Sequence, residues 1–133
     1  MSAMSSSGNV AARAIVTMEW IEDAFLVQRA EADPSPDAPD EWGGNAPFPT
    51  VAIIGLDDDT GSFSYAYADG RGVHRTYAME FDGTTWTVSG KARADFHQRF
   101  SATVGADSIE ARWERSEDGT TWDLDFEAVY RRT

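Results

Sequence analysis

The sequence contains no cysteine, which excludes disulfide bonds, thiolate metal ligands and a cysteine nucleophile. Basic residues are also scarce: 11 Lys and Arg stand against 23 Asp and Glu, and the net charge is −12. This balance argues against a nucleic-acid partner, since phosphate contacts need basic patches. No apolar run approaches the roughly 20 residues of a membrane span, and the first ten residues lack the basic and then apolar order of a signal peptide. We therefore expect the 133 residues to form a single cytoplasmic domain without a membrane partner.

Proline is absent from most of the chain, since all five prolines lie within residues 33–49. A regular helix or a central strand is excluded there. Residues 30–59 also hold eight acidic residues and no basic one. A solvated connecting loop is the simpler interpretation. The alternative is a lid, because long structureless loops in compact domains are often functional, and the large apolar Trp42 and Phe48 favour it. The sequence thus predicts a Pro-rich loop or lid over residues 32–49.

Outside this segment, apolar and polar residues alternate with a period of two, which is typical of strands with one buried face. In residues 62–68, for example, the three aromatic residues share one face. Short turns such as Asp82-Gly83 separate the alternating runs, and the pattern gives about nine strands and no helix. Hairpins throughout predict an all-β protein, an antiparallel up-and-down meander over residues 12–133 that closes into a barrel. A two-sheet sandwich is the alternative, and residues 1–11 are expected to be poorly ordered.

Several segments of the chain follow one another in a distinctive order and spacing. They are Glu19-Trp-Ile-Glu-Asp-Ala-Phe-Leu-Val-Gln-Arg29, Ala52-Ile-Ile-Gly-Leu-Asp57, Gly70-Arg-Gly-Val-His-Arg-Thr-Tyr77, Met79-Glu-Phe-Asp-Gly83, Gln98-Arg-Phe100, Arg112-Trp-Glu-Arg-Ser-Glu-Asp-Gly-Thr-Thr-Trp122 and Phe126-Glu-Ala-Val-Tyr-Arg131. In these segments the chain resembles bacterial lipocalin-like (calycin-type) domains, a family largely of unknown function. The resemblance implies a lipocalin/calycin-like barrel of about nine strands, and such a barrel can keep a cavity for a small ligand.

One feature departs from that resemblance. Domains of this kind usually begin with an extra strand that carries a Gly-x-Trp-x-Gly signature, and residues 1–10 contain no such motif. A barrel without that strand would be partly open or closed by a partner subunit, because an open sheet edge needs protection. A homodimer is therefore one expectation.

The faces that the alternation turns inward combine aromatic and polar side chains, which is typical of a small-molecule site. Arg75 is the most informative, because arginine is rarely buried without a partner, and it would clamp a carboxylate, phenolate or enolate oxygen. The alternatives are an internal ion pair or a rim position for Arg75, and plain core packing for the aromatic residues. The predicted ligand-binding residues are Trp20, Tyr65, Tyr67, Arg75, Tyr77, Met79, Trp86, Gln98, Phe100, Trp113 and Phe126, with Phe63, Phe81 and Phe96 on the same faces.

These residues support more than one function. The leading hypothesis is a binding module that holds a small apolar or aromatic molecule, with its polar end at Arg75 and the tyrosines. A cofactor-independent cyclase or isomerase is the alternative, with Arg75 and Tyr77 as electrophile or acid and Gln98 orienting the substrate. A haem-binding barrel similar to nitrobindin is weaker, because His74 and His97, its candidate axial ligands, fall on outward faces. A structural protein with a filled core is the fourth hypothesis. No cofactor is predicted.

The remaining polar clusters are interpreted as surface. Two histidines are too few for a histidine-rich zinc site, and the sequence shows no carboxylate set that would complete one, so no metal is predicted. Asp57-Asp-Asp59 lacks the spacing of a calcium loop and predicts a hairpin turn. Asp123, Asp125 and Glu127 alternate with apolar residues along the last strand, which places their carboxylates on the solvent face.

Overall fold

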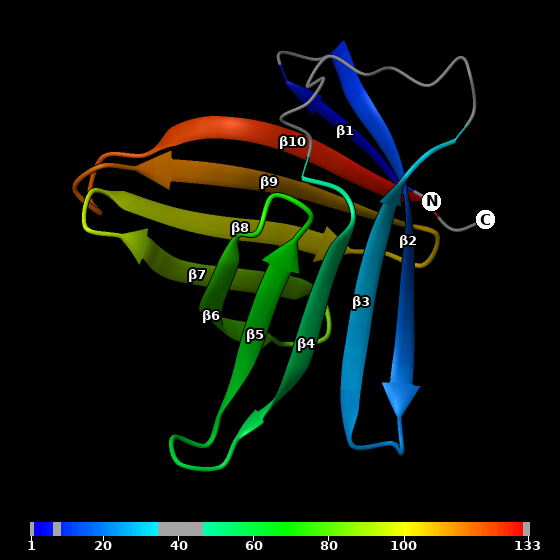
Figure 1. The fold of residues 1–133 in the computed structure, drawn as a ribbon, viewed down its shortest axis with the longest axis vertical. Coiled ribbons are helices and arrows are strands. Elements are labelled where there is room, and N and C mark those ends of the chain that lie inside the picture. Colours follow the sequence, from blue (N-terminus) through cyan, green and yellow to red (C-terminus); the bar gives the residue numbers. More distant parts are fainter. Residues whose placement is uncertain (1, 7–8, 35–46, 132–133) are drawn as a thin grey trace.

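The computed structural model describes residues 2–6, 9–34 and 47–131, which form ten β-strands (Figure 1). None of the described residues forms a helix of the length and apolarity that crossing a membrane requires. The strands are β1 (Ser2–Ser6), β2 (Asn9–Ile21), β3 (Phe25–Ala32), β4 (Thr50–Asp57), β5 (Ser62–Asp69), β6 (His74–Phe81), β7 (Thr85–Arg93), β8 (Phe96–Val104), β9 (Ser108–Ser116) and β10 (Asp123–Arg131).

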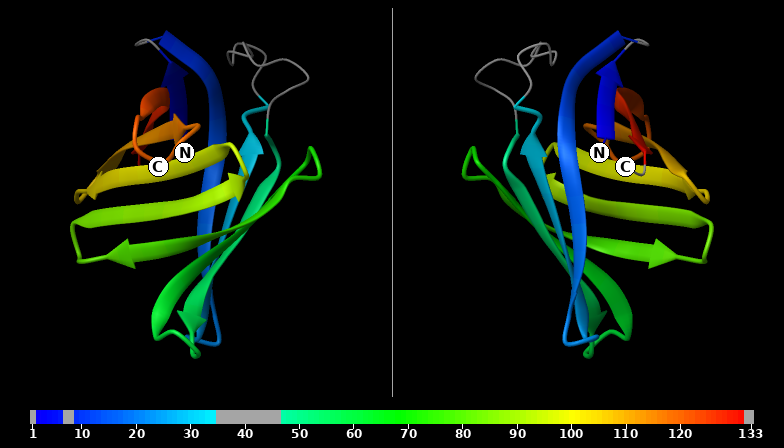
Figure 2. Two further views of the ribbon diagram at one scale, coloured as in Figure 1. Left: turned by 90° about the vertical axis from the view of Figure 1, so that its left-hand side faces the viewer. Right: turned by 90° about the vertical axis from the view of Figure 1, so that its right-hand side faces the viewer.

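The strands pair antiparallel, and β2 to β10 neighbour one another in chain order. This confirms the predicted all-β, up-and-down meander of nine strands. The alternative of a two-sheet sandwich is excluded. The sheet curls strongly, and β1 pairs with both β10 and β2, which closes the ring of hydrogen bonds. In Figure 2 the strands β2 to β5 cross the strands β6 to β9, so two walls of one sheet face each other across the interior.

The closing strand β1 lies in the N-terminal segment that the sequence was expected to leave poorly ordered and without a strand. Its Ser-Ala-Met-Ser-Ser composition carries no apolar alternation that would mark it. The pairing depends instead on the edges of β2 and β10, whose N–H and C=O groups need partners. Ser2 lies opposite Tyr130 on one side and Ala14 on the other. Closure of this barrel therefore comes from the same chain and needs no partner subunit.

The Pro-rich segment lies between β3 and β4, as predicted. Residues 35–46, with their tryptophan, lie outside the described residues, so the choice between loop and lid stays a prediction. The end of the segment rests on the β5–β6 turn: the Gly70 N–H donates to the carbonyl oxygens of Pro47 and Pro49, at 3.3 and 2.8 Å. A Cβ atom on Gly70 would lie 2.8 Å from the Phe48 carbonyl oxygen, so glycine permits this close approach.

Large aromatic and small side chains share the interior. Tyr65, Tyr77, Trp86 and Phe100 are buried on β5 to β8, and the ring centroids of Trp86 and Phe100 lie 4.8 Å apart. Four of the buried alanines, Ala52, Ala102, Ala111 and Ala128, belong to the same packed cluster as these aromatic side chains. The buried alanines are Ala14, Ala30, Ala52, Ala102, Ala111 and Ala128.

The β2–β3 and β4–β5 hairpins extend beyond the strands that cross them (Figures 1 and 2). We call the end of the barrel with the β2–β3, β4–β5 and β6–β7 turns the lower end, and the end with the β5–β6 turn the upper end. Trp20, Leu56 and Phe63 lie near the lower end and are 62%, 62% and 47% exposed. The expectation that large residues on inward faces would be enclosed is wrong for Trp20 and Phe63, because the facing strands do not reach that far.

Candidate functional site

The interior holds a cavity of about 350 Å³, and each strand from β2 to β10 contributes to its wall. The walls are mainly aromatic, and the polar side chains gather toward the upper end. The period-two alternation located most of this site, because paired residues of antiparallel neighbours lie on the same face of the sheet. Nine of the eleven predicted ligand-binding residues line the cavity: Tyr65, Tyr67, Arg75, Tyr77, Trp86, Gln98, Phe100, Trp113 and Phe126.

The other two predicted residues do not line the cavity. Trp20 lies opposite Leu26 on the inward face, but it is 62% exposed near the end of β2. Met79 packs against the buried core below the cavity. The alternation assigned the correct face to both residues. It carries no information on how far along each strand the opposite wall extends, and this is why the prediction failed for them.

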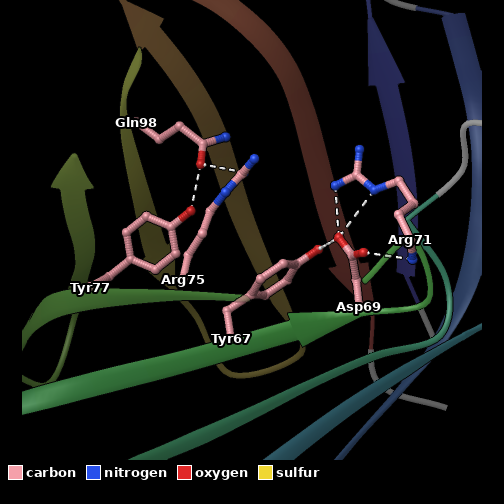
Figure 3. Close-up of polar contacts among 6 residues, drawn as sticks. All are labelled: Tyr67, Asp69, Arg71, Arg75, Tyr77 and Gln98. Carbon is pink, nitrogen blue, oxygen red and sulfur yellow. Dashed lines mark hydrogen bonds and ion pairs between the residues drawn. The ribbon is translucent and has the colours of Figure 1, made fainter. Parts of the chain in front are cut away.

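A hydrogen-bonded group of three side chains lies in the cavity wall (Figure 3). The Gln98 Oε1 atom accepts a hydrogen bond from Arg75 Nη1 at 2.8 Å and another from the Tyr77 hydroxyl at 2.5 Å. Arg75 and Tyr77 are two residues apart on β6 and therefore share a face. Gln98 reaches them from β8 across β7. Both donors converge on one acceptor, so the amide fixes the guanidinium and the phenol relative to each other.

Gly90 on β7 makes this arrangement possible. It pairs with Gln98, and a Cβ atom built on Gly90 would lie only 2.8 Å from Cδ1 of Tyr77. The Tyr77 ring therefore packs directly on the β7 backbone, which a larger residue would prevent. Gly90 was not among the predicted site residues. A glycine inside an otherwise regular strand is the signal that could have found it, since it often marks a close approach.

Arg75 has no carboxylate of the described residues within ion-pair distance, although it is half-buried. Its guanidinium carbon lies 5.5 Å from the centroid of the Phe96 ring. Gln98 accepts one of its five N–H donors. The internal ion pair, considered above as the alternative role of Arg75, is therefore not formed within the described part of the chain. The guanidinium group of Arg75 faces the cavity and keeps N–H donors that Gln98 does not use.

A second group surrounds Asp69 at the mouth of the cavity (Figure 3). The Asp69 carboxylate accepts hydrogen bonds from the Tyr67 hydroxyl at 2.7 Å and from Arg71 Nη2 at 2.7 Å. Burial of Asp69 acts to raise its pKa, but the hydrogen bonds from Arg71 and Tyr67 together outweigh it and lower the pKa to about 2. The Arg71 charge is thus balanced by Asp69. The Asp69-Gly-Arg-Gly72 segment is recognisable in the sequence as a turn, but Arg71 was not among the predicted site residues.

The phenol groups of the cavity stay protonated at neutral pH. Burial raises the pKa of Tyr65 and of Tyr77 above the usual value for a phenol. Burial also raises the pKa of Tyr130 to about 12. For Tyr67, burial and then the bond to the Asp69 carboxylate raise the pKa. The four tyrosines therefore carry O–H groups and no phenolate, and the O–H groups of Tyr67 and Tyr77 already donate to Asp69 and Gln98.

Within the described part of the chain, two buried polar atoms of the wall have no hydrogen-bond partner: Gln28 Oε1 and Trp86 Nε1. Both side chains line the cavity and are less than 8% exposed. Leaving a buried donor or acceptor unpaired costs roughly 1–3 kcal/mol. A ligand in the cavity would recover that cost. Gln28 was not among the predicted site residues, although it interrupts the apolar run of β3 at an inward position.

Asp125 also lines the cavity, which corrects its predicted place on the solvent face. The pairing of β10 with β9 shifts between Leu124 and Phe126, and Asp125 is the extra residue of this bulge. The bulge turns Asp125 inward and leaves Leu124 42% exposed. No arginine lies within ion-pair distance of its carboxylate among the described residues. A single extra residue in a strand leaves no mark in the alternation, so the sequence could not place it.

The other polar clusters lie away from the cavity. His74 is exposed, and the His97 ring lies against Gly119 in the β9–β10 turn. Neither histidine lines the cavity wall, so neither is placed to hold a haem there. Asp57 forms the predicted hairpin turn, because its carboxylate accepts from the Asp59 N–H at 2.9 Å. Within the described ranges, no group of three or more His, Cys, Asp or Glu residues is arranged to hold a metal ion.

Comparisons with protein-family models, with curated proteins and with solved structures found no match. The fold and the site define a class, a small antiparallel barrel with an aromatic cavity and a cation in its wall. The function is therefore argued from the chemistry of that cavity.

Proposed function

We propose that this protein is a cytoplasmic binding module, and that its ligand is a small apolar or aromatic molecule with an anionic oxygen at one end. The observation that carries the proposal is Arg75, a half-buried guanidinium in an aromatic cavity without a carboxylate partner in the described chain. A buried cation is stabilised by an opposite charge. A ligand carboxylate, phenolate or enolate would supply that charge and accept the unused N–H donors.

The rest of the cavity supports the same ligand. Trp86, Phe100 and Trp113 form a continuous aromatic wall, with 5.2 Å between the ring centroids of Phe100 and Trp113. This wall suits a planar or apolar body. The unpartnered Trp86 N–H donates to an acceptor on the ligand, and the unpartnered Gln28 oxygen accepts from a donor. Mostly apolar walls with a few placed polar groups give affinity and orientation together.

The protonation states favour binding over acid–base catalysis. The pKa values of the four cavity tyrosines are raised, and that of Asp69 is lowered to about 2. A general acid or base works best with a pKa near the working pH, and these shifts lead away from it. The cyclase or isomerase remains a second candidate because Arg75 lies in the wall with N–H donors that Gln98 does not use, and these would polarise a bound carbonyl oxygen without transferring a proton.

The resemblance to bacterial lipocalin-like domains is part of this proposal. It rests on the sequence segments alone, of which residues 70–77 and 98–100 contribute Arg75, Tyr77 and Gln98. Those three residues form the hydrogen-bonded group in the cavity wall. Self-association of the barrel is not required for the cavity, because every strand of its wall comes from one chain.

Fluorescence titration with a matched pair of probes tests the proposal. Trp86 and Trp113 line the cavity, so a bound probe quenches them. We expect 1-naphthoate to bind more tightly than uncharged 1-naphthalenemethanol. Replacing Arg75 by Gln should weaken naphthoate about tenfold or more, equivalent to roughly 1.4 kcal/mol, and should leave the alcohol nearly unaffected.

The control is Arg112→Gln, which removes an exposed arginine from β9 and should change neither affinity. Circular dichroism checks that both variants fold. If neither probe gives saturable quenching of the wild-type protein, or if Arg75→Gln binds naphthoate as tightly as wild type, the proposal is wrong. Turnover of a bound unsaturated ketone or enolate would instead establish the enzyme.

A further inference from the structure

The inward sheet face continues below the cavity as an apolar surface. On this face Leu56 pairs with Phe63, and Phe63 pairs with Met79. Two strands away, Trp20 pairs with Leu26, which in turn pairs with Ile54. Paired residues in antiparallel strands lie on one face, so these side chains form a continuous surface across β2 to β6. We call its exposed members, Met18, Trp20, Leu56, Phe63 and Phe81, the lower face.

The lower face is open to solvent, although it consists of large apolar side chains of the kind that usually form a core. Trp20 and Leu56 are 62% exposed, and Met18, Phe63 and Phe81 are 45% to 48% exposed. Met79 pairs in turn with Val88, and Val88 pairs with Phe100, so these residues form one row with Phe63 across β5 to β8. Val88 and Phe100 are 1% and 3% exposed. Contiguous exposed apolar surface with a polar rim marks an interaction site on soluble proteins. These residues lie on the inward face of the sheet, beyond the strands that would cover them.

The rim of the lower face carries negative charge only. The turns at this end hold Glu22 and Asp23, Asp57 to Asp59, and Asp82, and Glu80 precedes the last turn. No Lys or Arg occurs in residues 14–28, 30–70 or 76–90. An apolar surface inside an acidic rim complements a partner that is apolar and basic. A second copy of this chain would bring two acidic rims together, which opposes self-association at this end.

We propose that the lower face binds a cationic amphipathic segment of another protein. The apolar side of the segment covers Trp20, Leu56 and Phe63, and its Lys or Arg side chains reach the acidic turns. This is the recognition mode in which an amphipathic helix lies in an apolar groove. A few residues dominate the binding energy of protein interfaces, and tryptophan is enriched among them. The proposal is independent of what the cavity binds, since the lower-face residues do not line the cavity.

Peptide binding to the intact protein tests this inference. The probe is a fluorescein-labelled helical peptide of Leu and Lys with one apolar side, measured by anisotropy. A peptide of the same composition in scrambled order and an amphipathic Leu–Glu peptide are its controls. We expect saturable binding of the Leu–Lys peptide, at least tenfold weaker binding of the scrambled one, and none of the Leu–Glu peptide.

Surface variants locate the binding site. The double variant Trp20→Ser/Phe63→Ser should weaken the Leu–Lys peptide about tenfold or more. The matched control is Val51→Ser/Ile53→Ser, since these residues are 38% and 49% exposed on the opposite face of the same sheet. Asp58→Asn/Asp59→Asn should weaken binding at low salt and flatten its salt dependence. Its control, Asp123→Asn/Glu127→Asn, removes two exposed acids of β10 and should have little effect.

Three results would overturn the inference. The first is equal binding of the ordered and scrambled peptides, which would mean attraction by net charge alone. The second is unchanged binding by Trp20→Ser/Phe63→Ser. The third is a dimer mass by light scattering that returns to the monomer mass in the same variant, since the occupant would then be a second copy of this chain.

Discussion

The two ends of this barrel are made from the same strands, yet they differ in burial and in charge. Val88 and Phe100, which line the cavity, are 1% and 3% exposed. On the same sheet row, Phe63 is 47% exposed where the hairpins extend further. The cavity wall contains Arg75, which has no carboxylate partner in the described chain. The charged residues of the lower turns, in contrast, are all acidic. One alternating pattern has thus produced a core at one end and a surface at the other.

This difference shows what decides burial in a curled sheet. Alternation chooses the face on which a side chain lies, but enclosure requires a second wall at the same height. Where that wall is present, apolar side chains stabilise the fold. Where it is absent, the same side chains contribute little to stability and are available to a partner. Substitutions at matched positions separate these two contributions.

The largest expected effect on the free energy of unfolding is at a buried residue beside the cavity. Phe100→Ala removes a buried ring that packs against both Trp86 and Trp113. Loss of a buried phenylalanine of this kind costs about 3–5 kcal/mol. Phe63→Ala, on the same row, should cost well under half as much because the ring is already half in water. Urea unfolding followed by circular dichroism measures both free energies. Equal losses would contradict the comparison.

A smaller effect is expected where a glycine lets two layers approach. Gly90→Ala forces the Tyr77 ring away from β7, because the new Cβ would lie 2.8 Å from Cδ1. Overpacking of this kind costs roughly 1–3 kcal/mol. It should also weaken naphthoate, since Tyr77 and Arg75 share Gln98 as acceptor. Gly55→Ala on β4 is the matched control: its Cβ would lie at 3.6 Å from Phe25, an ordinary contact, so little change in either measurement is expected.

The charged group at the cavity mouth should show itself in the pH dependence of stability. The pKa of Asp69 is about 2 in the folded protein, below the unfolded value of 3.8. The carboxylate therefore stabilises the fold fully above about pH 4, and this contribution is lost as the pH falls toward 2. Asp69→Asn should lower the unfolding free energy by about 1–2 kcal/mol at pH 7 and by less at pH 2.5. A constant difference between the two proteins over this range would exclude the assignment.

The sequence predicted the meander and the cavity wall for one physical reason, which is that side-chain direction in a strand depends only on position parity. Arg75, Tyr77 and Gln98 were found in this way. Features that depend on the neighbouring strand or on backbone geometry could not be predicted from position parity. Asp125 turns inward at a bulge, and β1 closes the barrel through its backbone without an apolar pattern.

The site details that escaped prediction have the same origin. The hydrogen bond that joins Arg75 to Gln98 spans 23 positions in the sequence, and its partner depends on the register of three strands. Gln28 Oε1 is unpaired because its described neighbours in space offer it no hydrogen-bond donor. A local sequence pattern contains no information on those neighbours. Conversely, Trp20 has the correct parity but lies beyond the opposite wall. Strand overlap is the quantity that the sequence leaves open.

The smallest effect on stability is expected at the lower face itself. Trp20→Ser/Leu56→Ser removes two large apolar side chains that are each 62% exposed, so the unfolding free energy should change by no more than about 0.5 kcal/mol per site. Binding of an uncharged apolar dye such as Nile red to the folded protein should fall in the same variant, because the dye loses exposed apolar surface. Ile53→Ser alone, on the opposite face, is the control for dye binding. If the double variant lost several kcal/mol, these side chains would be part of the core, and the contrast between the two ends of the barrel would not hold.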